Sequence, residues 1–376
     1  MQTESASAGI DVEVHNHFDS VPDPLKTALS PARVPFLESL SWFRCLASSL
    51  PSHHELRIYT ASKQDHRDVL ALFTHRARGS SRLSGLVSHY SVSSCIATTA
   101  IGPVRASLLR AVFQALSRER PRWTLVALRL LDEGGDLYQT CLESLQEAGF
   151  HLEPFFQYHN WYLSRAGRSF DDYWYQRPGA LKNTLRRKAR ALAEGHRMSL
   201  RVVTSSGPEL EMALNDFSCI YSSSWKGPEP DPDFIPALAR AAADAGCLWL
   251  AILTIDETPA AGQLWIVSHG RATIYKLAYR PEFARFSTGT ILSAALFQRV
   301  FELDNLTEID YGIGDEPYKQ DWMESCRTRV GLLARNTLTV RGMAASIVTR
   351  ALKATKAAIG RLSPGKLPTS QLCRRP

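Results

Sequence analysis

The chain has 376 residues, of which 44% are hydrophobic and 22% are charged, a composition typical of soluble globular proteins with a buried core. At about 100–200 residues per domain, this length predicts two domains. No apolar run approaches the ~20 residues that cross a bilayer, and the polar, acidic N-terminus does not have the pattern of a signal peptide.

The positive charge is concentrated at the C-terminal end. The net charge is +7, yet the last 36 residues (341–376) contain eight Lys and Arg and no acid, which leaves 36 basic and 37 acidic residues before them. A basic tail differs from a basic binding face, so we expect no nucleic acid as a partner of the body of the protein. Seven scattered cysteines without a C-x-x-C pair indicate reduced thiols and a cytoplasmic protein.

The first part of the chain predicts a lead-in segment followed by an α/β domain. Residues 1–35 are rich in Ser, Pro, Asp and His and show no sustained period, so we expect them to be mobile. From 36 to 167, helices alternate with strands. The expected helices are 36–48, 106–117 and 137–148, and the expected strands are 56–59, 123–130 and 155–163.

A second α/β series follows over residues 168–340. Its expected helices are 178–194, 209–223, 234–245 and 290–302, and its expected strands are 200–204, 248–255, 260–268, 272–279 and 308–312. Two halves of similar size are consistent with a divergent duplication. In the basic tail 341–376, the segment 343–362 interleaves apolar and basic residues, which suits either contact with an anionic membrane surface or a solvated helix.

The loop between the strand 272–279 and the helix that follows it predicts an anion site. The free N–H groups and the dipole at a helix N-terminus attract negative charge. Glycine allows the backbone to approach a phosphate closely, hydroxyls add donors, and arginine adds a fixed charge. The residues that would do this are Arg285, Ser287, Thr288, Gly289 and Thr290. An ordinary turn between a strand and a core helix has the same local pattern.

At these residues the chain resembles the GNAT superfamily of acyl-CoA-dependent N-acetyltransferases, whose CoA-pyrophosphate region runs strand, R-x-x-x-G-T, helix, strand. The runs AGQLWIV, YKLAYRPEFARFSTGT and EIDYGIGDEPYKQDW are similar to its FemAB-like branch, and more narrowly to the BioF-like, or CelD-type, acetyltransferases of cellulose biosynthesis. The resemblance covers residues 168–335. The usual GNAT loop is Q/R-x-x-G-x-G/A, whereas Arg285 to Gly289 has one extra residue and no second glycine.

The resemblance implies two tandem GNAT-like domains, each a mixed, mostly antiparallel sheet flanked by helices, with 168–340 as the catalytic one. It implies that the strands 272–279 and 308–312 splay apart to admit the pantetheine arm of acetyl-CoA or another acyl-CoA. The arm would pair with the backbone at Leu277, Ala278 and Tyr279, where an N–H group would stabilise the oxyanion. No metal is expected, since the histidines lack further ligands at suitable spacing.

Candidate acid–base groups lie in the run from 308 to 322. Strand alternation places Asp310 on one face, where a partly desolvated carboxylate would accept the ammonium proton. Asp315, after two glycines, is the other candidate base. FemAB-like enzymes carry a lysine in a context similar to that of Lys319, which would bind a phosphate or the tetrahedral intermediate. Tyr318 would protonate the departing thiolate, unless it is simply a half-buried tyrosine with a hydrogen bond.

Five further residues are candidates for binding the acceptor. An exposed tryptophan can contact a sugar or amine through its face, and lysine can do so through its charge. A lysine in a central strand needs a partner, so Lys276 either forms a salt bridge with an acid such as Asp310 or touches substrate. The set is Trp225, Lys226, Gln263, Lys276 and Trp322.

The leading hypothesis is an N-acyltransferase that moves an acetyl or other acyl group from acyl-CoA to an amino group. The resemblance to cellulose-biosynthesis proteins suggests an amino sugar or glycan precursor as acceptor, in polysaccharide or envelope biosynthesis. Three alternatives stay open: a FemAB-like transferase that uses aminoacyl-tRNA, an N-acyl amino acid synthase that uses acyl carrier protein, and a non-catalytic acyl-CoA-binding scaffold. We expect a cytoplasmic location, with the tail as the segment that would touch the inner membrane.

Overall fold

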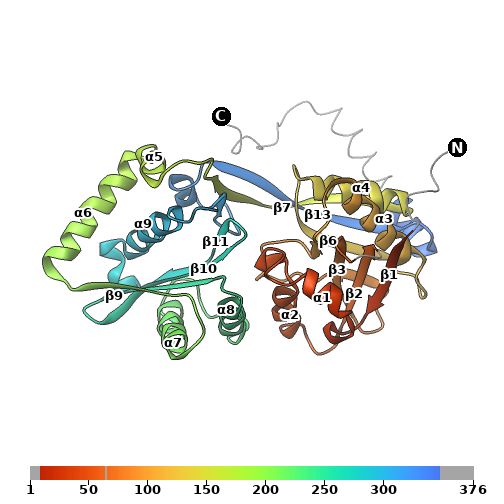
Figure 1. The fold of residues 1–376 in the computed structure, drawn as a ribbon, viewed down its shortest axis with the longest axis horizontal. Coiled ribbons are helices and arrows are strands. Elements are labelled where there is room, and N and C mark those ends of the chain that lie inside the picture. The colour runs from red at the N-terminus through yellow and green to blue at the C-terminus, as the bar shows by residue number, and fades with distance from the viewer. Residues whose placement is uncertain (1–8, 64–65, 348–376) are drawn as a thin grey trace. The chain divides into compact units, whose positions relative to one another are not determined.

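The computed structural model describes residues 9–63 and 66–347, which form an α/β structure (Figure 1). The chain divides into two compact units that are discontinuous in sequence. Unit 1 contains the described residues of 1–33, 50–158 and 327–376, and unit 2 contains 34–49 and 159–326. Strand β7 (Phe150–Ser164) begins in unit 1 and ends in unit 2.

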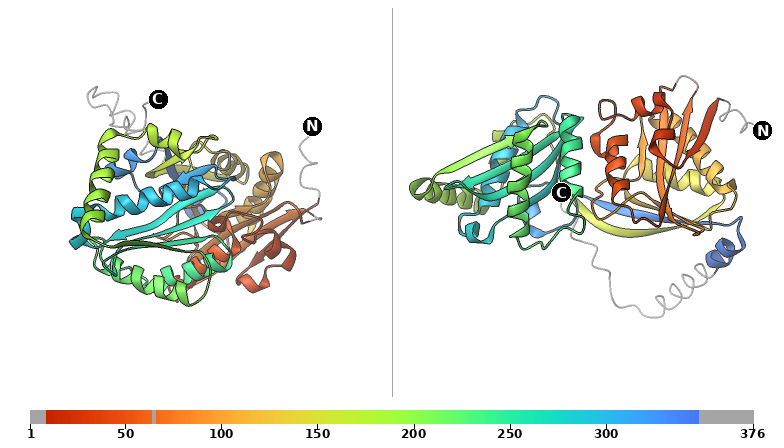
Figure 2. Two further views of the ribbon diagram at one scale, coloured as in Figure 1. Left: turned by 60° about the vertical axis from the view of Figure 1, so that its left-hand side comes forward. Right: turned by 90° about the horizontal axis from the view of Figure 1, so that it is seen from below.

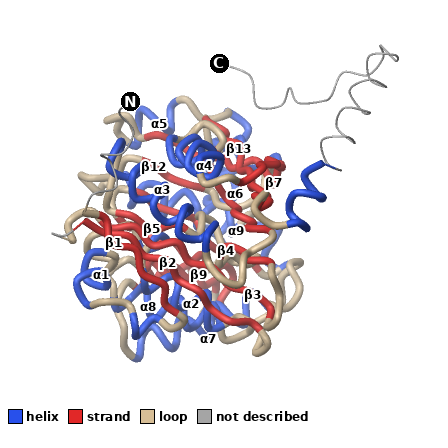
Figure 3. The backbone as a smooth tube through the Cα atoms, turned by 90° about the vertical axis from the view of Figure 1, so that its right-hand side faces the viewer, coloured by secondary structure: helices blue, strands red, loops and turns tan. Residues whose placement is uncertain are grey.

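Unit 1 is built on an antiparallel meander of β1, β2, β3 and β4, in which β5 also pairs with β3. Strand β6 runs parallel to β4, and β13 runs antiparallel to β6. Helices α3 and α4 pack against each other and against this sheet (Figure 3). The bounds are β1 Ile10–His15, β2 His54–Lys63, β3 Val69–Ala77, β4 Arg82–Gly85, β5 Ile96–Thr98, β6 Leu125–Asp132, β13 Ser325–Asn336, α1 Asp23–Ala28, α3 Gly102–Arg118 and α4 Asp136–Glu147.

Unit 2 repeats this plan. Strands β8, β9, β10 and β11 form an antiparallel meander, β12 runs parallel to β11, and the end of β7 runs antiparallel to β12. Helices α7 and α8 cover one face of the sheet, and α6 and α9 cover the other (Figures 1 and 2). The bounds are β8 Met198–Val203, β9 Leu248–Ile255, β10 Thr258–Ser268, β11 Arg271–Tyr279, β12 Glu308–Asp310, α2 Leu40–Ser48, α5 Phe170–Tyr175, α6 Gly179–Gly195, α7 Pro208–Ser222, α8 Phe234–Asp244 and α9 Thr288–Phe301.

Strand β10 shows why helices lie on both faces of the unit 2 sheet. It is almost continuously buried, as expected for a central strand covered on both sides. Gly262 faces α7, because a Cβ atom there would lie 2.7 Å from the Phe217 ring. The next residue, Gln263, faces α9, where it donates to the Ser293 hydroxyl. The alternation therefore places successive β10 residues against opposite helix layers.

The expected fold class is confirmed: mixed, mostly antiparallel sheets flanked by helices. The two units share one topology, a four-stranded meander, a helical crossover, a parallel strand and a final antiparallel strand. In each unit that final strand comes from a distant part of the chain. Unit 1 receives β13, and unit 2 receives residues 159–164 of β7, whose Tyr162–Ser164 pair with β12.

Two expectations about organisation require correction. Residues 1–35 were expected to be mobile, yet β1 pairs with β2 along its whole length and Asp23–Ala28 form α1. The alternation Ile10, Val12, Val14 is simply too short to register as a period. The contiguous ranges 36–167 and 168–340 also differ from the compact units, because the segment 34–49 belongs to unit 2.

The segment 34–49 is tied to unit 2 by specific contacts. The Trp42 ring lies 6.2 Å from the Phe234 ring of α8 and 6.1 Å from the Tyr275 ring of β11. The Phe36 N–H donates to the Ser268 hydroxyl at 3.0 Å. The tail from 348 onward, with most of the expected basic segment, lies outside the described residues. None of the helices in the described part of the chain is long and apolar enough to cross a membrane.

Candidate active site

The loop predicted to bind an anion lies at the start of α9. The helix begins at Thr288, two residues earlier than expected, so Ser287 is the N-cap residue. Ser287 adopts the left-handed conformation (φ 54°), and its side chain makes no capping hydrogen bond. Thr288, Gly289 and Thr290 therefore form the first helical turn rather than a loop. A first turn without a side-chain cap retains N–H donors for a ligand.

Gly289 is needed for close packing and not for an unusual backbone angle. It lies inside the helix, and a Cβ atom there would be 3.3 Å from Cδ1 of Tyr279. The Tyr279 ring in turn packs on the Trp225 ring, with 4.6 Å between centroids. The absence of a side chain thus lets the start of α9 approach the end of β11.

Two of the predicted phosphate ligands are placed differently from expectation. The Thr288 side chain is fully buried, so its hydroxyl does not line the open turn. Arg285 is exposed, with its guanidinium 4.6 Å from the centre of the Phe286 ring. Its carbonyl accepts a hydrogen bond from Lys188 of α6. The basic helix α6 therefore lies beside the turn that leads into α9.

Strands β11 and β12 separate, as the resemblance implies. Their parallel pairing covers only Arg271–Thr273 and Glu308–Asp310. Beyond it the chain continues through Gly312 (φ 67°), where a Cβ atom would lie 3.3 Å from the Ile274 carbonyl oxygen, and Gly314 (φ 94°). Within the described residues, β12 thus pairs with none of residues 274–279 of β11. The predicted pantetheine-binding residues 277–279 lie in this segment.

A β-bulge sets the direction of Lys276. Leu264 pairs with Lys276, but Trp265 pairs with Ile274, so Tyr275 is an extra residue in β11. A bulge places two successive residues on similar faces of the sheet. Tyr275 accordingly contacts Trp42, and Lys276 points to Tyr221 of α7 at 3.5 Å.

The structure brings three lysines together from separate segments, and we call Lys226, Lys276 and Lys319 the lysine cluster. Lys276 forms a 2.6 Å ion pair with Glu229. Lys319 pairs with Glu316 at 2.8 Å.

Lys226 has a different environment. Its ammonium lies 5.7 Å and 5.9 Å from the centres of the Trp225 and Tyr221 rings. Desolvation, with a smaller contribution from the charge of Lys276, lowers the pKa of Lys226 to about 8.

Lys319 supports the loop after β12. Its ammonium donates to the carbonyls of Ile313 and Gly314, and its side chain is almost fully buried. Burial lowers the pKa of Lys319, while the hydrogen bond that its ammonium donates to Glu316 opposes that shift. These contacts favour a positioning role over direct contact with phosphate.

Asp310 does not face an open site. It is 5% exposed, and its Oδ1 accepts hydrogen bonds from Nδ2 of Asn160 at 2.8 Å and from the Gly312 N–H at 2.7 Å. This carboxylate therefore fixes the turn at which β12 leaves β11, which corrects its expected position beside an amine. Asp315 is exposed in the same loop.

Two predicted substrate-binding residues belong to the core. Gln263 is 1% exposed, donates to the Ser293 hydroxyl at 2.8 Å and accepts from the Trp265 indole at 2.8 Å. Trp322 is buried, with its ring 4.8 Å from that of Phe297. Both side chains are committed to packing inside unit 2, so they do not reach an acceptor.

Tyr318 remains accessible. It is 43% exposed, and its ring meets that of Tyr311 edge-on at 5.7 Å. Desolvation raises the pKa of Tyr318 to about 12, with a contribution from Glu316, so the hydroxyl keeps its proton near neutral pH. Trp225 is also exposed, at 57%.

Three residues of the site, Tyr221, Glu229 and Glu316, were not predicted from the sequence. Glu229 stands between prolines in a loop, where no period indicates its direction. Only the folded chain shows that it meets Lys276.

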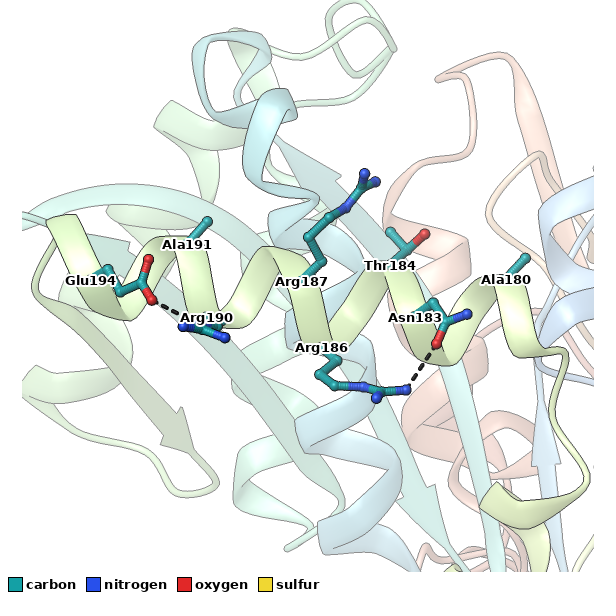
Figure 4. Close-up of a pocket in the computed structure, with 8 residues that line it drawn as sticks. All are labelled: Ala180, Asn183, Thr184, Arg186, Arg187, Arg190, Ala191 and Glu194. Carbon is teal, nitrogen blue, oxygen red and sulfur yellow. Dashed lines mark hydrogen bonds and ion pairs between the residues drawn. The ribbon is translucent and has the colours of Figure 1, made fainter.

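The exposed face of α6 carries an open hollow rather than a cavity, because one helix alone lines it (Figure 4). Arg186 donates to Asn183 at 2.8 Å, and Arg190 pairs with Glu194 at 2.7 Å. Arg187 points away from both pairs in Figure 4. These features are typical of a solvated helix face.

The described residues contain no group of three His, Cys, Asp or Glu arranged to hold a metal ion. Cys219 and Cys247 of unit 2 are free thiols, whereas Cys326 is disulfide-bonded, in contrast to the expected reduced state.

Comparisons with known proteins agree with this geometry. Residues 179–320 match the sequence model of the acetyltransferase (GNAT) domain family. FemX is similar in structure, with a TM-score of 0.57 at 10% identity, over 88% of this chain and all of FemX. A conserved protein of unknown function from Bacteroides thetaiotaomicron VPI-5482 has a TM-score of 0.52 at 10% identity, over 86% of this chain and all of that one. No curated protein sequence matches the chain.

Residues 179–320, which lie in unit 2, therefore form a GNAT acetyltransferase domain. The fold of the chain is FemAB-like, as the likeness to FemX over almost the whole chain shows. The resemblance of this region to the GNAT superfamily is therefore confirmed.

Proposed function

We propose that the protein is an N-acyltransferase that moves an acyl group, most simply acetyl, from acyl-CoA to an amino group. The main support is one continuous segment that has two features. First, residues 274–279 of β11 extend beyond the part of the strand that pairs with β12. Second, the turn after β11 leads into helix α9, whose N-terminus has no side-chain cap. The first feature suits the amides of pantetheine, and the second suits the pyrophosphate.

In this reaction the amine nitrogen bonds to the thioester carbonyl carbon and the carbon–sulfur bond breaks. CoA leaves as a thiolate that takes up one proton, and the ammonium gives up one proton. A backbone N–H group near Ala278 or Tyr279 stabilises the oxyanion. Tyr318, which keeps its proton at neutral pH, is the proposed donor to the thiolate. Since Asp310 is buried in a turn, the exposed Asp315 is the remaining candidate base of the two predicted.

For the acceptor we propose an amino sugar or glycan precursor in polysaccharide or envelope biosynthesis. Trp225 supports this, since its exposed ring, backed by Tyr279, is a surface on which a sugar ring can stack. The resemblance to CelD-type proteins points the same way. Reaction in the cytoplasm fits a CoA donor. An acyl carrier protein or aminoacyl-tRNA donor would instead engage the basic face of α6.

The test uses the full-length protein. Isothermal titration measures acetyl-CoA binding, and a free-thiol assay follows CoA release with glucosamine, other amino sugars and amino acids. We expect saturable binding and amine-dependent thiol release. Binding without release on any amine would favour the scaffold hypothesis. Absence of acetyl-CoA binding would favour a carrier-protein or tRNA donor.

A further inference from the structure

Unit 2 contains a pocket of about 210 Å³ between α7, α8 and the loop that joins them. Most of its wall is hydrocarbon, contributed by Leu214, Phe217, Tyr221, Pro232, Ile235 and Pro236. Four of these side chains are buried, and the prolines restrict the backbone of the wall. The pocket is therefore an apolar site with a preformed shape, as is typical of small-molecule sites.

One side of the pocket reaches the proposed reaction centre. Tyr221 and Glu229 line the pocket, and both contact the ammonium of Lys276, at 3.5 Å and 2.6 Å. Lys276 belongs to the 274–279 edge of β11 and faces α7 because of the bulge at Tyr275. A molecule in the pocket thus has an apolar end against α7 and α8 and a polar end beside the proposed donor strand.

The size and polarity of the pocket select its occupant. An apolar cavity of about 150 Å³ holds a benzene-sized molecule, so this pocket holds a group of roughly six to eight non-hydrogen atoms. A sugar ring of that size carries several hydroxyls, and each buried hydroxyl without a partner is unfavourable. The polar side chains of the lining are Ser218 and Ser222, both exposed at the rim, and Glu229, which is engaged by Lys276. An aliphatic or aromatic group fits better.

We propose that this pocket binds an apolar group carried next to the amino group of the acceptor, with that amine held at Glu229 and Lys276. The proposal rests on the proposed acyl transfer and narrows its acceptor class. The acceptor is a primary amine with a branched aliphatic or aromatic substituent, and a glycan precursor used here carries such a substituent.

The lysine cluster adds a chemical reason for this placement. Nearby positive charge disfavours a further cation, and the same effect contributes to the lowered pKa of Lys226. The charges of Lys276 and Lys226 lower the pKa of an acceptor amine held beside them, and the carboxylate of Glu229 opposes this effect. The neutral amine is the form that attacks a thioester. A lower pKa of the amine therefore reduces the need for a general base to remove its proton.

The experiment measures binding of 2-phenylethylamine and glucosamine to the full-length protein by isothermal titration, and repeats it with Ser218→Trp. Ser218 lies at the rim of the pocket, so a large ring there fills it. The matched control is Met212→Trp, at an exposed α7 position that does not line the pocket. We expect Ser218→Trp to weaken 2-phenylethylamine binding at least tenfold and Met212→Trp to change it less than twofold. We also expect wild type to bind 2-phenylethylamine more tightly than glucosamine.

A further titration tests whether the apolar group in the pocket is instead the acyl chain of the donor. Hexanoyl-CoA and acetyl-CoA are titrated into the same variants. A loss of hexanoyl-CoA affinity in Ser218→Trp with unchanged amine binding would assign the pocket to the acyl chain and overturn the proposal. Equal amine affinity in all variants, or tighter glucosamine binding, would also overturn it. Absence of acetyl-CoA binding would contradict the acyl-CoA reaction, while the amine titration would still test the pocket.

Discussion

In unit 1 the strand that corresponds to β11 is broken into two pieces. β4 pairs with β3 at Thr74 and His75, and β5 pairs with β3 at Leu70–Leu72. Parallel pairing with β6 covers Arg82–Ser84, which leaves only Gly85 of β4 beyond it. In unit 2, β11 is continuous and extends through 274–279 beyond its partner. Two sheets of one topology therefore differ at the element that would hold a thioester donor.

The charged groups of the two units differ in the same direction. In unit 1, Glu119 accepts hydrogen bonds from Arg57, Tyr59 and the Trp123 indole, so this network is closed on itself. In unit 2, Lys226 contacts aromatic rings, and its neighbours include the cation of Lys276. A network whose members all pair with one another stabilises the fold. A lysine held close to a second cation, with a shifted pKa, is typical of a functional site.

The largest expected effect comes from cutting the chain between its apparent halves. The fragment 168–340 lacks the strand that pairs with β12 and lacks Trp42, so we expect no cooperative urea unfolding and no acetyl-CoA binding. The matched control joins 34–49 through a Gly/Ser linker to 159–326, which restores both elements. We expect this control to unfold cooperatively in a denaturation curve followed by tryptophan fluorescence. Acetyl-CoA binding by 168–340 as tight as that of the full chain would refute this division.

A smaller effect distinguishes the two crossover helices. Gly289 is the second residue of α9, and Pro103 is the second residue of α3. A carboxylate at Gly289 would repel the pyrophosphate, so Gly289→Asp should weaken acetyl-CoA binding about 10- to 100-fold, roughly 1–3 kcal/mol. Pro103→Asp, at an exposed position of unit 1, should leave the affinity within twofold. Isothermal titration measures both, and a loss in the second variant alone would move the donor site to unit 1.

The smallest effect concerns the pH dependence contributed by Lys226. Its pKa is about 8 in the folded protein, below the ordinary value of about 10.5, so between these two pH values the unfolded chain binds more protons. The free energy of unfolding should therefore gain a contribution that rises with pH across this window. Because the residue is exposed, we expect less than about 1 kcal/mol. Urea denaturation from pH 7 to 10.5 measures it.

Lys226→Met should remove the rise of the free energy of unfolding with pH. Its stabilisation relative to wild type should be largest below pH 8, where Lys226 is charged in the folded protein. Lys226→Arg serves as the control, since it stays charged in both states and should also flatten the slope without that gain. A slope that persists in both variants would assign the titration to another group.

Much of the secondary structure follows from local patterns. The apolar run 248–255 predicts β9 at its observed bounds, because a strand buried on both faces needs no longer-range information. Helix α9 begins two residues before its predicted start because Ser287 adopts a left-handed conformation, which a serine in the sequence does not predict. Strand β3 was missed although Val69–Phe73 is buried, since its polar end obscures the pattern.

The candidate site is less predictable because its geometry depends on distant partners. The residue types Lys226, Lys276, Lys319 and Tyr318 are visible in the sequence, and the fold places them in unit 2. The direction of the Lys276 side chain depends on a β-bulge in β11, and its partner Glu229 comes from a proline-rich loop. The local sequence predicts Asp310 as a catalytic base, but its hydrogen bond from Asn160 of β7 makes it part of a turn.

The strand that completes unit 1 also has a consequence for biosynthesis. β6 ends at Asp132, but its partner β13 ends at Asn336, so about 200 residues separate the two on a ribosome that adds about 5–20 residues per second. The edge of β6 therefore waits roughly 10–40 seconds for its neighbour after it leaves the exit tunnel. An unpaired strand edge is a template for association with other chains during that interval. Nascent chains of this protein should accordingly depend on chaperones until translation is nearly finished, and slower translation should lower the soluble yield.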